Sequence, residues 1–328
     1  MPDVFSKAWQ HIWTGIKYWS FKSVSYISGK VPVRFAYWVG AAVGDFIYLT
    51  WKQHSANAVS NMRRVLGEAA DWRLVKEVAR DSFRNYAKTI VDFLRFPHLQ
   101  VDDIHEAIST QHGWENLEAA LRKGKGVVVV SAHLGNWDLA GALMGSRGLP
   151  LHAVADRFDP RMDQLINGTR QRYGINIIKM EVGSLKQIFA ALKRNEIVLL
   201  LFDRPQPDEG VPVQFFGETA YLPAGPAAIS LKTGAAIVIG YCARRRGDKT
   251  FFGAFEPPIE YEHLLTGDKE RDIQIVTQEI VRRMEAIIRR YPDQWYMFRQ
   301  MWPRTERHNA EVKRRRLWGG GSPAEIAS

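Results

Sequence analysis

The sequence contains a single cysteine, Cys242, among its 328 residues. One cysteine cannot form an internal disulfide framework, and it excludes an iron–sulfur cluster or a zinc site built from several thiolates. No two histidines have the close spacing on one element that zinc sites commonly use. The chain also lacks a G-x-S-x-G sequence, which would mark the serine nucleophile of an α/β-hydrolase. We therefore expect no metal centre.

The sequence also lacks an apolar run long enough to cross a bilayer. The nearest is FAYWVGAAVGDFIYLTW at residues 35–51, which is 17 residues long and contains Asp45. A bilayer core needs about 20 mostly apolar residues. The N-terminus has no short apolar stretch followed by the small-residue cleavage site of a secretory signal. We predict a hydrophobic hairpin or interfacial helix that is retained and lies on the membrane rather than across it.

Basic residues are concentrated at the two ends of the chain. The formal net charge is +10; residues 1–66 carry 8 bases against 2 acids, and residues 281–318 carry 11 against 4. No nucleic-acid-binding fold signature accompanies this charge, and the bases stand beside large apolar side chains, so we expect no nucleic-acid partner. With 46% apolar and 24% charged residues, the composition is that of a globular protein of one or two domains.

Tryptophan is abundant at the N-terminus. Five of the eleven tryptophans fall in the first 52 residues, interleaved with lysine and arginine. Five apolar residues recur at helical spacing and would form one stripe: Trp9, Ile12, Trp13, Ile16 and Trp19. Such a stripe could pack on the protein's own core, but aromatic and basic residues together are typical of a bilayer interface. We interpret residues 1–66 as membrane-associating helices.

From Gly126 onward, short β-rich runs alternate with helical stretches. The strands are predicted at Val127–Ser131, Leu151–Ala155, Ile175–Lys179, Ile197–Phe202 and Ala236–Ala243, and the helices at 137–147, 160–173, 184–194, 225–233 and 270–291. This alternation predicts an α/β domain, residues 67–302, with a mostly parallel central sheet flanked by helices. Within this domain, residues 71–97 read as one or two amphipathic helices ahead of the first predicted strand. Residues 303–328 read as a basic C-terminal helix and a disordered tail.

The residues that carry chemistry follow the first predicted strand. The segment VVVVSAHLGNWDL, residues 127–139, runs from a buried strand through a turn into a helix, which puts His133 where open α/β sheets bind ligands. Asn136 suits the N-cap of that helix, and Asp138 then lies in its first turn. We expect the Asp138 carboxylate to accept a hydrogen bond from the imidazole of His133. A histidine held in one tautomer in this way is a general base.

No protein nucleophile is evident beside this base, so the attacking group would be a hydroxyl of the acceptor substrate. Two other readings stay open. The same histidine and aspartate could activate water, as in an acyl-thioester hydrolase, or the chain could be a membrane-binding scaffold without catalysis. Only the scaffold reading predicts that His133 can be replaced without consequence.

The segment SAHLGNWDLAG resembles the H-x-x-x-x-D/E motif of the lysophospholipid acyltransferase superfamily. Over residues 30–302 the chain is most similar to the branch that contains the bacterial lipid A biosynthesis (lauroyl and myristoyl) acyltransferases and the mycobacterial phosphatidylinositol mannoside acyltransferase. Four further segments carry the resemblance: AVSNMRRVLG, VADRFDPRMDQLINGTRQRYG, LLLFDRPQPDEGVPVQFFGETAYLPAGPAAISLKTGA and YPDQWYMFRQMW. Asp138, where lipid A enzymes usually carry glutamate, and the QFFGE and LPAGPA stretches are closer to the mannoside enzyme.

The resemblance implies transfer of a fatty acyl group from acyl-CoA or acyl carrier protein to a hydroxyl of a glycolipid or phospholipid precursor. It implies a peripheral enzyme of lipid biosynthesis on the cytoplasmic face of the bacterial inner (plasma) membrane, working without metal or redox cofactor. His133 would be the base and Asp138 the residue that orients it. Glu218, in the FFGE segment, is a second carboxylate that could reach His133.

The resemblance also suggests substrate-binding residues. Arg157 and Arg170 match basic positions of the branch, and Arg204 follows the strand that ends near Asp203. Guanidinium groups at strand ends suit a phosphate or pyrophosphate of either substrate, although each could equally be a solvated or salt-bridged arginine. Gly135 could help present backbone N–H groups to the thioester oxyanion or could simply form a tight turn.

Overall fold

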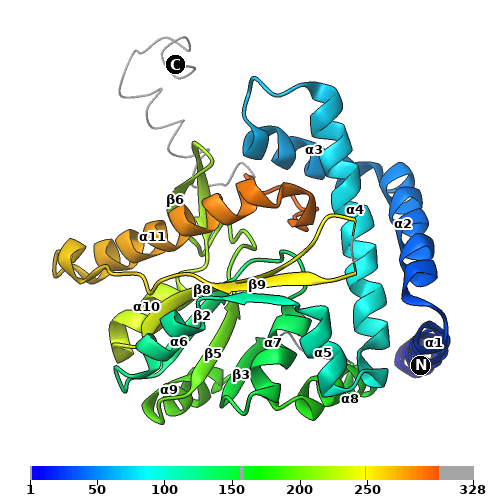
Figure 1. Ribbon diagram of the computed structural model, residues 1–328, viewed down its shortest axis with the longest axis horizontal. Coiled ribbons are helices and arrows are strands. Elements are labelled where there is room, and N and C mark those ends of the chain that lie inside the picture. The colour runs from blue at the N-terminus through cyan, green and yellow to red at the C-terminus, as the bar shows by residue number, and fades with distance from the viewer. Residues whose placement is uncertain (1, 156–158, 248, 303–328) are drawn as a thin grey trace.

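A computed structural model describes residues 2–155, 159–247 and 249–302 of the chain. A sheet of seven strands lies at its centre, with helices on both faces and a group of N-terminal helices along one side (Figure 1). The strand order is β1-β9-β8-β2-β5-β3-β4. Strands β8, β2, β5, β3 and β4 are parallel, whereas β9 and β1 run the opposite way. This confirms the predicted α/β architecture with a mostly parallel sheet.

The elements have the following bounds. The helices are α1 Pro2–Lys30, α2 Val33–Thr50, α3 Lys52–Leu66, α4 Trp72–Arg95, α5 Val101–Ala107, α6 Trp114–Leu121, α7 Trp137–Ser146, α8 Pro160–Arg172, α9 Ser184–Lys193, α10 Gly225–Thr233 and α11 Lys269–Arg290. The short 3-10 turns are η1 Phe96–His98, η2 Glu262–Leu264 and η3 Pro292–Gln294. The strands are β1 Thr110–His112, β2 Val127–Ser131, β3 Leu151–Ala155, β4 Ile175–Lys179, β5 Ile197–Leu201, β6 Val211–Phe215, β7 Glu218–Leu222, β8 Ala236–Arg244 and β9 Phe251–Phe255.

Strand β2 shows why the sheet is covered on both faces. Its four valines are buried, and because successive side chains point to opposite faces, they belong to two different cores. Val128 and Val130 pack in the cluster that includes α3, α4, α9, α10 and α11. Val127 and Val129 pack in the cluster that includes α6 and the end of α7. A central strand with no polar face leaves its chemistry to the residues that follow it.

The predicted strands and helices from Val127 to Arg290 are present, most within one residue of their expected ends. The sequence did not predict β1, β6, β7 or β9. Strands β6 and β7 form an antiparallel hairpin whose turn, Phe216–Gly217, has positive φ angles of 50° and 80°. A phenylalanine rarely adopts that conformation, so the usual Asn-Gly sign of a tight hairpin was missing. Strand β1 is too short to leave a pattern.

Helix α2 lies against α4 because small residues line the contact. A Cβ atom on Gly44 would lie 2.7 Å from the carbonyl oxygen of Phe83 and 2.8 Å from the Cα atom of Arg84. A Cβ on Gly40 would lie 3.1 Å from a methyl group of Val91. The backbone of α2 therefore approaches α4 as closely as glycine allows.

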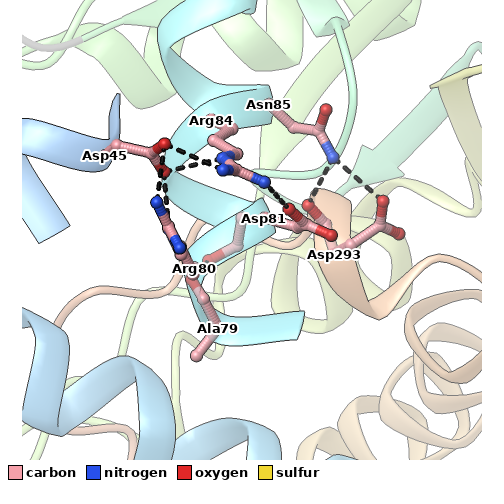
Figure 2. Close-up of polar contacts among 8 residues, drawn as sticks. Asp45, Ala79, Arg80, Asp81, Arg84, Asn85 and Asp293 are labelled. Atoms are coloured by element: carbon pink, nitrogen blue, oxygen red, sulfur yellow. Dashed lines mark hydrogen bonds and ion pairs between the residues drawn. The ribbon is translucent and has the colours of Figure 1, made fainter. Parts of the chain in front are cut away.

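An ion-pair network fastens the same two helices (Figure 2). The carboxylate of Asp45 on α2 accepts two hydrogen bonds from Arg80 and two from Arg84, all between 2.6 and 2.9 Å. Hydrogen bonds from Arg84 and Arg80 lower the pKa of Asp45 to about 2. At the next residue of α4, the Asn85 amide donates to the backbone carbonyl and the carboxylate of Asp293 in η3, each at 2.9 Å. Helix α4 thus joins α2 to the segment after α11.

The outward faces of α1 and α2 are apolar and exposed. Ile16 and Trp19 on α1 and Trp38 and Phe46 on α2 have half or more of their surface open to solvent, so these residues do not pack on the protein's own core. The side chains of Trp9, Ile12 and Trp13 lie outside the described part. None of the helices in residues 2–155, 159–247 and 249–302 is both long enough and apolar enough to cross a membrane.

The three-part division of the chain stays a prediction. Ala58 and Met62 of α3 belong to the same buried cluster as Val128 and Val130 of β2. The expected C-terminal helix and tail, 303–328, lie outside the described residues.

Candidate active site

His133 and Asp203 face one another at the carboxyl edge of the parallel strands. His133 is the second residue after β2, and Asp203 is the second residue after β5. These strands are parallel neighbours with Ser131 opposite Leu201, so the residues that follow them meet at the same height. The Nδ1 nitrogen of His133 lies 2.6 Å from Oδ1 of Asp203.

Asp203 is the most fully engaged carboxylate of this region. It is 1% exposed, and besides the ring of His133 it accepts the backbone N–H of His133 at 3.0 Å and the indole N–H of Trp295 at 2.8 Å. Burial by itself raises the pKa of Asp203, but the charge and hydrogen bonds of His133 and the indole of Trp295 outweigh it and hold that pKa below its ordinary value. The carboxylate therefore stays ionised. It fixes Nδ1 as the donor and leaves Nε2 of His133 as the acceptor.

The turn after His133 is held by hydrogen bonds from the segment after α11. Tyr296 donates its N–H to the His133 carbonyl at 2.8 Å, and Gly135 donates its N–H to the Gln294 carbonyl at 3.0 Å. Gly135 has a φ of 63°, and a Cβ there would lie 1.9 Å from the Cys242 carbonyl oxygen. Its N–H is thus already occupied. The geometry fits the tight-turn alternative for Gly135, and the presentation of other backbone N–H groups of this turn to an oxyanion stays a prediction.

Asp138 does not take the place expected for it. As predicted, Asn136 caps α7, accepting the N–H of Leu139 at 3.0 Å, and Asp138 lies in the first turn. Its carboxylate, however, accepts a hydrogen bond from Nε of Arg170 on α8 at 2.7 Å. The partner of the His133 Nδ1 is Asp203 instead, because β5 brings its carboxylate to the ring. Asp138 and Arg170 form a half-buried ion pair between α7 and α8, so Arg170 is a salt-bridged residue.

The other predicted site residues lie apart from this pair. Glu218, on β7, forms an ion pair with Arg64 of α3, which corrects the expectation that its carboxylate reaches His133. The hairpin β6–β7 packs on α11, and this directs Glu218 toward the N-terminal helices. Arg204 directly follows Asp203 and is exposed at the carboxyl edge of the sheet. Arg157 lies outside the described residues.

Sequence reasoning missed Asp203 and Trp295. A signal for Asp203 was available, because it stands as far beyond its strand as His133 stands beyond β2. Reading it required the knowledge that β2 and β5 are neighbours. Trp295 follows η3 and is fully buried, and its position depends on how the chain returns to the sheet after α11. No local pattern carries that information.

A second carboxylate, Asp92 of α4, binds the turn that runs from His133 to Asn136, which we call the catalytic turn. Its Oδ2 accepts the side-chain N–H of Asn136 at 3.1 Å and is paired with Arg244 at the end of β8. Its Oδ1 accepts the hydroxyl of Tyr37 on α2 at 2.5 Å. One side chain therefore connects the N-cap of α7 with β8 and with the exposed N-terminal helix.

Aromatic rings lie beside the base. The ring of Trp137 meets that of His133 edge to face at 5.4 Å, and Tyr296 lies 6.2 Å from Trp137. Tyr86 of α4 continues the row, 5.1 Å from Tyr296. Three aromatic rings therefore form a row that begins at the imidazole of His133.

No thiol or metal centre accompanies the pair. Burial raises the pKa of the Cys242 thiol well above its ordinary value, which makes it a poor nucleophile. Among the residues that the structure describes, no three His, Cys, Asp or Glu side chains come together as metal ligands would. What the geometry offers is a histidine whose Nδ1 contacts a buried carboxylate.

Comparison with known proteins identifies the family. The family model of the bacterial lipid A biosynthesis acyltransferases matches residues 3–304. The chain belongs to this family. It is therefore an acyltransferase, and the resemblance described from the sequence is confirmed.

The curated relatives agree with this assignment. A phosphatidylinositol mannoside acyltransferase of Mycolicibacterium smegmatis is 29% identical over 250 residues, 74% of this chain and 77% of the relative. The phosphatidylinositol mannoside acyltransferase of Mycobacterium tuberculosis is 29% identical over 197 residues, 58% of each chain. A lipid A biosynthesis acyltransferase of Haemophilus influenzae is 25% identical over 192 residues, 58% of this chain and 57% of the relative. With the last two relatives, the matched part is less than two thirds of their length.

Proposed function

We propose that this enzyme transfers a fatty acyl group from a thioester, acyl-CoA or acyl carrier protein, to a hydroxyl of a membrane glycolipid, with His133 as the general base. The observation that carries the proposal is the 2.6 Å contact between Nδ1 of His133 and the buried carboxylate of Asp203. Membership of a family of lipid acyltransferases and similarity to mannoside and lipid A acyltransferases support the substrate class.

The proposed reaction needs one base and no enzyme nucleophile. Nε2 of His133 takes the proton of the acceptor hydroxyl while the hydroxyl oxygen attacks the thioester carbonyl carbon, and an oxyanion forms. The carbon–sulfur bond then breaks, the ester is released, and the thiolate receives the proton from the imidazolium. Asp203 stabilises that imidazolium and remains ionised throughout, because its pKa is already held low.

The basic residues of this edge would bind the phosphates of the substrates. Arg204 lies next to Asp203 and is exposed, as a group that meets an incoming phosphate must be. Arg157, which lies outside the described residues, keeps the same proposed role. Arg170 acts differently: its guanidinium is bound to Asp138, and the pair would shape the wall of the site as one unit.

We place the enzyme on the cytoplasmic face of the bacterial inner membrane, with α1 and α2 as its anchor. Exposed tryptophans beside lysines suit the headgroup region of a bilayer. Lys22 lies 5.4 Å from the ring of Trp19, and Trp38 projects from α2 into solvent.

The catalytic proposal is tested with purified protein and its His133→Ala and Asp203→Asn variants. Each is incubated with acyl-CoA or acyl carrier protein thioester and a phosphatidylinositol mannoside or lipid A precursor in detergent. Acylated acceptor and free fatty acid are quantified separately by mass spectrometry. We expect acylated acceptor from the wild type only. Free fatty acid in equal amount with and without acceptor would instead identify a thioester hydrolase, and transfer by folded His133→Ala at the wild-type rate would refute the mechanism.

The anchor is tested by substitution rather than truncation, because α2 also carries Asp45 and Tyr37, which bind α4. Trp38→Asp combined with Phe46→Asp changes only exposed side chains. We expect the variant to lose flotation with anionic vesicles and to keep the melting temperature of the wild type. Unchanged flotation would remove α2 from the anchor.

A further inference from the structure

A second group of exposed apolar side chains lies at the turn between β4 and α9. Met180 and Leu185 have more than half of their surface exposed, and Val182, at the tip, is fully exposed. We name these three residues the β4–α9 tip. The turn is closed by a hydrogen bond of 3.0 Å from the N–H of Ser184 to the carbonyl of Glu181, and Gly183 takes the left-handed conformation before α9. The tip is a defined turn that presents its apolar side chains to solvent.

The tip lies on the same edge of the sheet as the catalytic pair. Strands β2, β5, β3 and β4 are parallel neighbours in that order, so the residues that follow them share one edge. Three strand spacings separate β2 from β4, which is roughly 14 Å. Leu201, at the end of β5 between them, is one third exposed. Leu201 therefore adds one exposed apolar side chain at this edge, between the tip and the end of β2.

The tip is also connected to the N-terminal helices. Lys179, which ends β4, forms an ion pair of 2.5 Å with Asp163 on the first turns of α8. The N-cap residue of the same helix, Asp159, accepts a hydrogen bond from Thr14 of α1. Helices α8 and α1 lie side by side in Figure 1. The exposed residues Ile16 and Trp19 of α1 lie within the next two turns after Thr14, so α1 and the tip both carry exposed apolar side chains close to α8.

We infer that the β4–α9 tip inserts into the lipid bilayer as a second contact, separate from α1 and α2, and brings the site of His133 to the membrane surface. The inference rests on the proposed function, because it supposes that the acceptor is a membrane lipid. Each valine, leucine or methionine side chain that enters the bilayer contributes a favourable free energy of transfer from water. Two separate contacts with the bilayer would fix the direction in which the site opens, which one anchoring helix does not.

A bilayer fits the tip better than a protein partner does. A stable protein interface buries about 800 Å² on each partner, whereas this tip is three side chains on one narrow turn. Lys186 is exposed beside Leu185, and Arg204 is exposed at the same edge of the sheet. Exposed cations of this kind attract anionic lipid headgroups. Glu181 is the one acidic residue between Lys179 and Lys186 in the sequence.

The chain allows a site-selective test. Its single cysteine, Cys242, is buried and its thiol pKa is raised, so it does not compete with a cysteine introduced at the surface. Val182→Cys in the full chain is labelled with an environment-sensitive nitrobenzoxadiazole dye. Leu265→Cys is the control, because Leu265 is also an exposed apolar residue. Hydrogen bonds from Glu256 to Ile239 and from Ile259 to Ile237 bring the segment after β9 to the start of β8, at the opposite edge of the sheet.

Both labelled proteins are mixed with vesicles of phosphatidylethanolamine and phosphatidylglycerol, and binding is followed in the same samples by flotation. We expect a blue shift and a several-fold rise in emission at position 182, quenched by spin-labelled acyl chains, and no change at position 265. Floating protein whose dye at position 182 stays in water would overturn the inference and leave α1 and α2 as the anchor. Protein that does not float overturns it as well. A response at position 182 to acyl carrier protein alone, without response to vesicles, would assign the tip to the donor.

A kinetic arm separates this inference from the proposed function. The double variant Val182→Asp, Leu185→Asp should raise the apparent KM for acceptor presented in vesicles by about tenfold. It should leave kcat and the KM for the same acceptor dispersed in detergent unchanged. If the double variant had the same KM as the wild type for acceptor in vesicles, insertion of the tip would be refuted. Absence of acyl transfer by the wild type in detergent would refute the proposed function without affecting the dye measurement.

Discussion

The Nδ1 nitrogen of His133 and the Oδ1 oxygen of Asp203 lie 2.6 Å apart, although 70 residues separate them in the sequence. The short distance follows from the parallel pairing of β2 with β5 and from the equal distance of both residues from the ends of these strands. Because Asp203 is buried and holds three donors, its removal cannot be compensated by solvent.

Asp203→Asn should lower kcat for acyl transfer by about 10²–10⁴, the range of general-base catalysis. The amide can donate to Nδ1, which reverses the tautomer and removes the acceptor at Nε2. The control is Asp138→Asn, which replaces the carboxylate bound to Arg170 and should have a smaller effect on kcat. The rates of both variants, checked for folding by circular dichroism, decide between the two aspartates. A larger loss in Asp138→Asn would return the orienting role to Asp138.

Trp295→Phe should lower kcat about tenfold and leave the KM values near those of the wild type, because it removes one hydrogen bond to a charged group. The indole N–H helps to hold the pKa of Asp203 low. Without it, that pKa rises, and we expect the acid side of the pH–rate profile to move to higher pH. The measurement is kcat against pH for both proteins. A profile that does not move would show that Trp295 only fills space.

Asp45 should make the protein sensitive to acid. Its pKa is about 2 in the folded protein and about 3.9 in an unfolded chain. A lowered carboxyl pKa contributes stability that is present above pH ~4 and is lost as pH falls toward 2. Melting temperatures between pH 7 and pH 2 should therefore fall more steeply below pH 4 for the wild type than for Asp45→Asn. Parallel curves would mean that the pairs with Arg80 and Arg84 do not contribute.

Gly44→Ala should lower the free energy of unfolding by about 1–3 kcal/mol, since the new methyl group would overlap the backbone of α4. Gly168→Ala is the matched control. Gly168 lies in α8, and a Cβ there meets nothing within 4 Å, so the substitution should stabilise the helix by up to about 1 kcal/mol. Urea denaturation of the two variants gives both values. Equal stability of the variants would show that α2 and α4 can separate without cost.

The features that the sequence predicted are those with local causes. Four consecutive valines followed by a turn and an N-cap asparagine define β2, the position of His133 and the start of α7 within 13 residues. The partner of His133 depends on strand order, which no local pattern contains, so Asp138 was chosen because it was near in sequence. The same limit applies to Trp295 and to Arg64, whose partner Glu218 is distant in the sequence, on β7.

If α1 and α2 anchor the enzyme as proposed, the position of Asp92 bears on how a form without that anchor should be made. Tyr37 of α2 and Asn136 of the catalytic turn bind opposite oxygens of this carboxylate. Cutting away α2 would leave Asp92 one partner short and would strip Arg80 and Arg84 of Asp45. An engineered enzyme that dissolves without lipid should therefore keep α2 in full and exchange only its outward aromatic residues for polar ones, so that the surface changes and the buried hydrogen bonds of the catalytic turn remain.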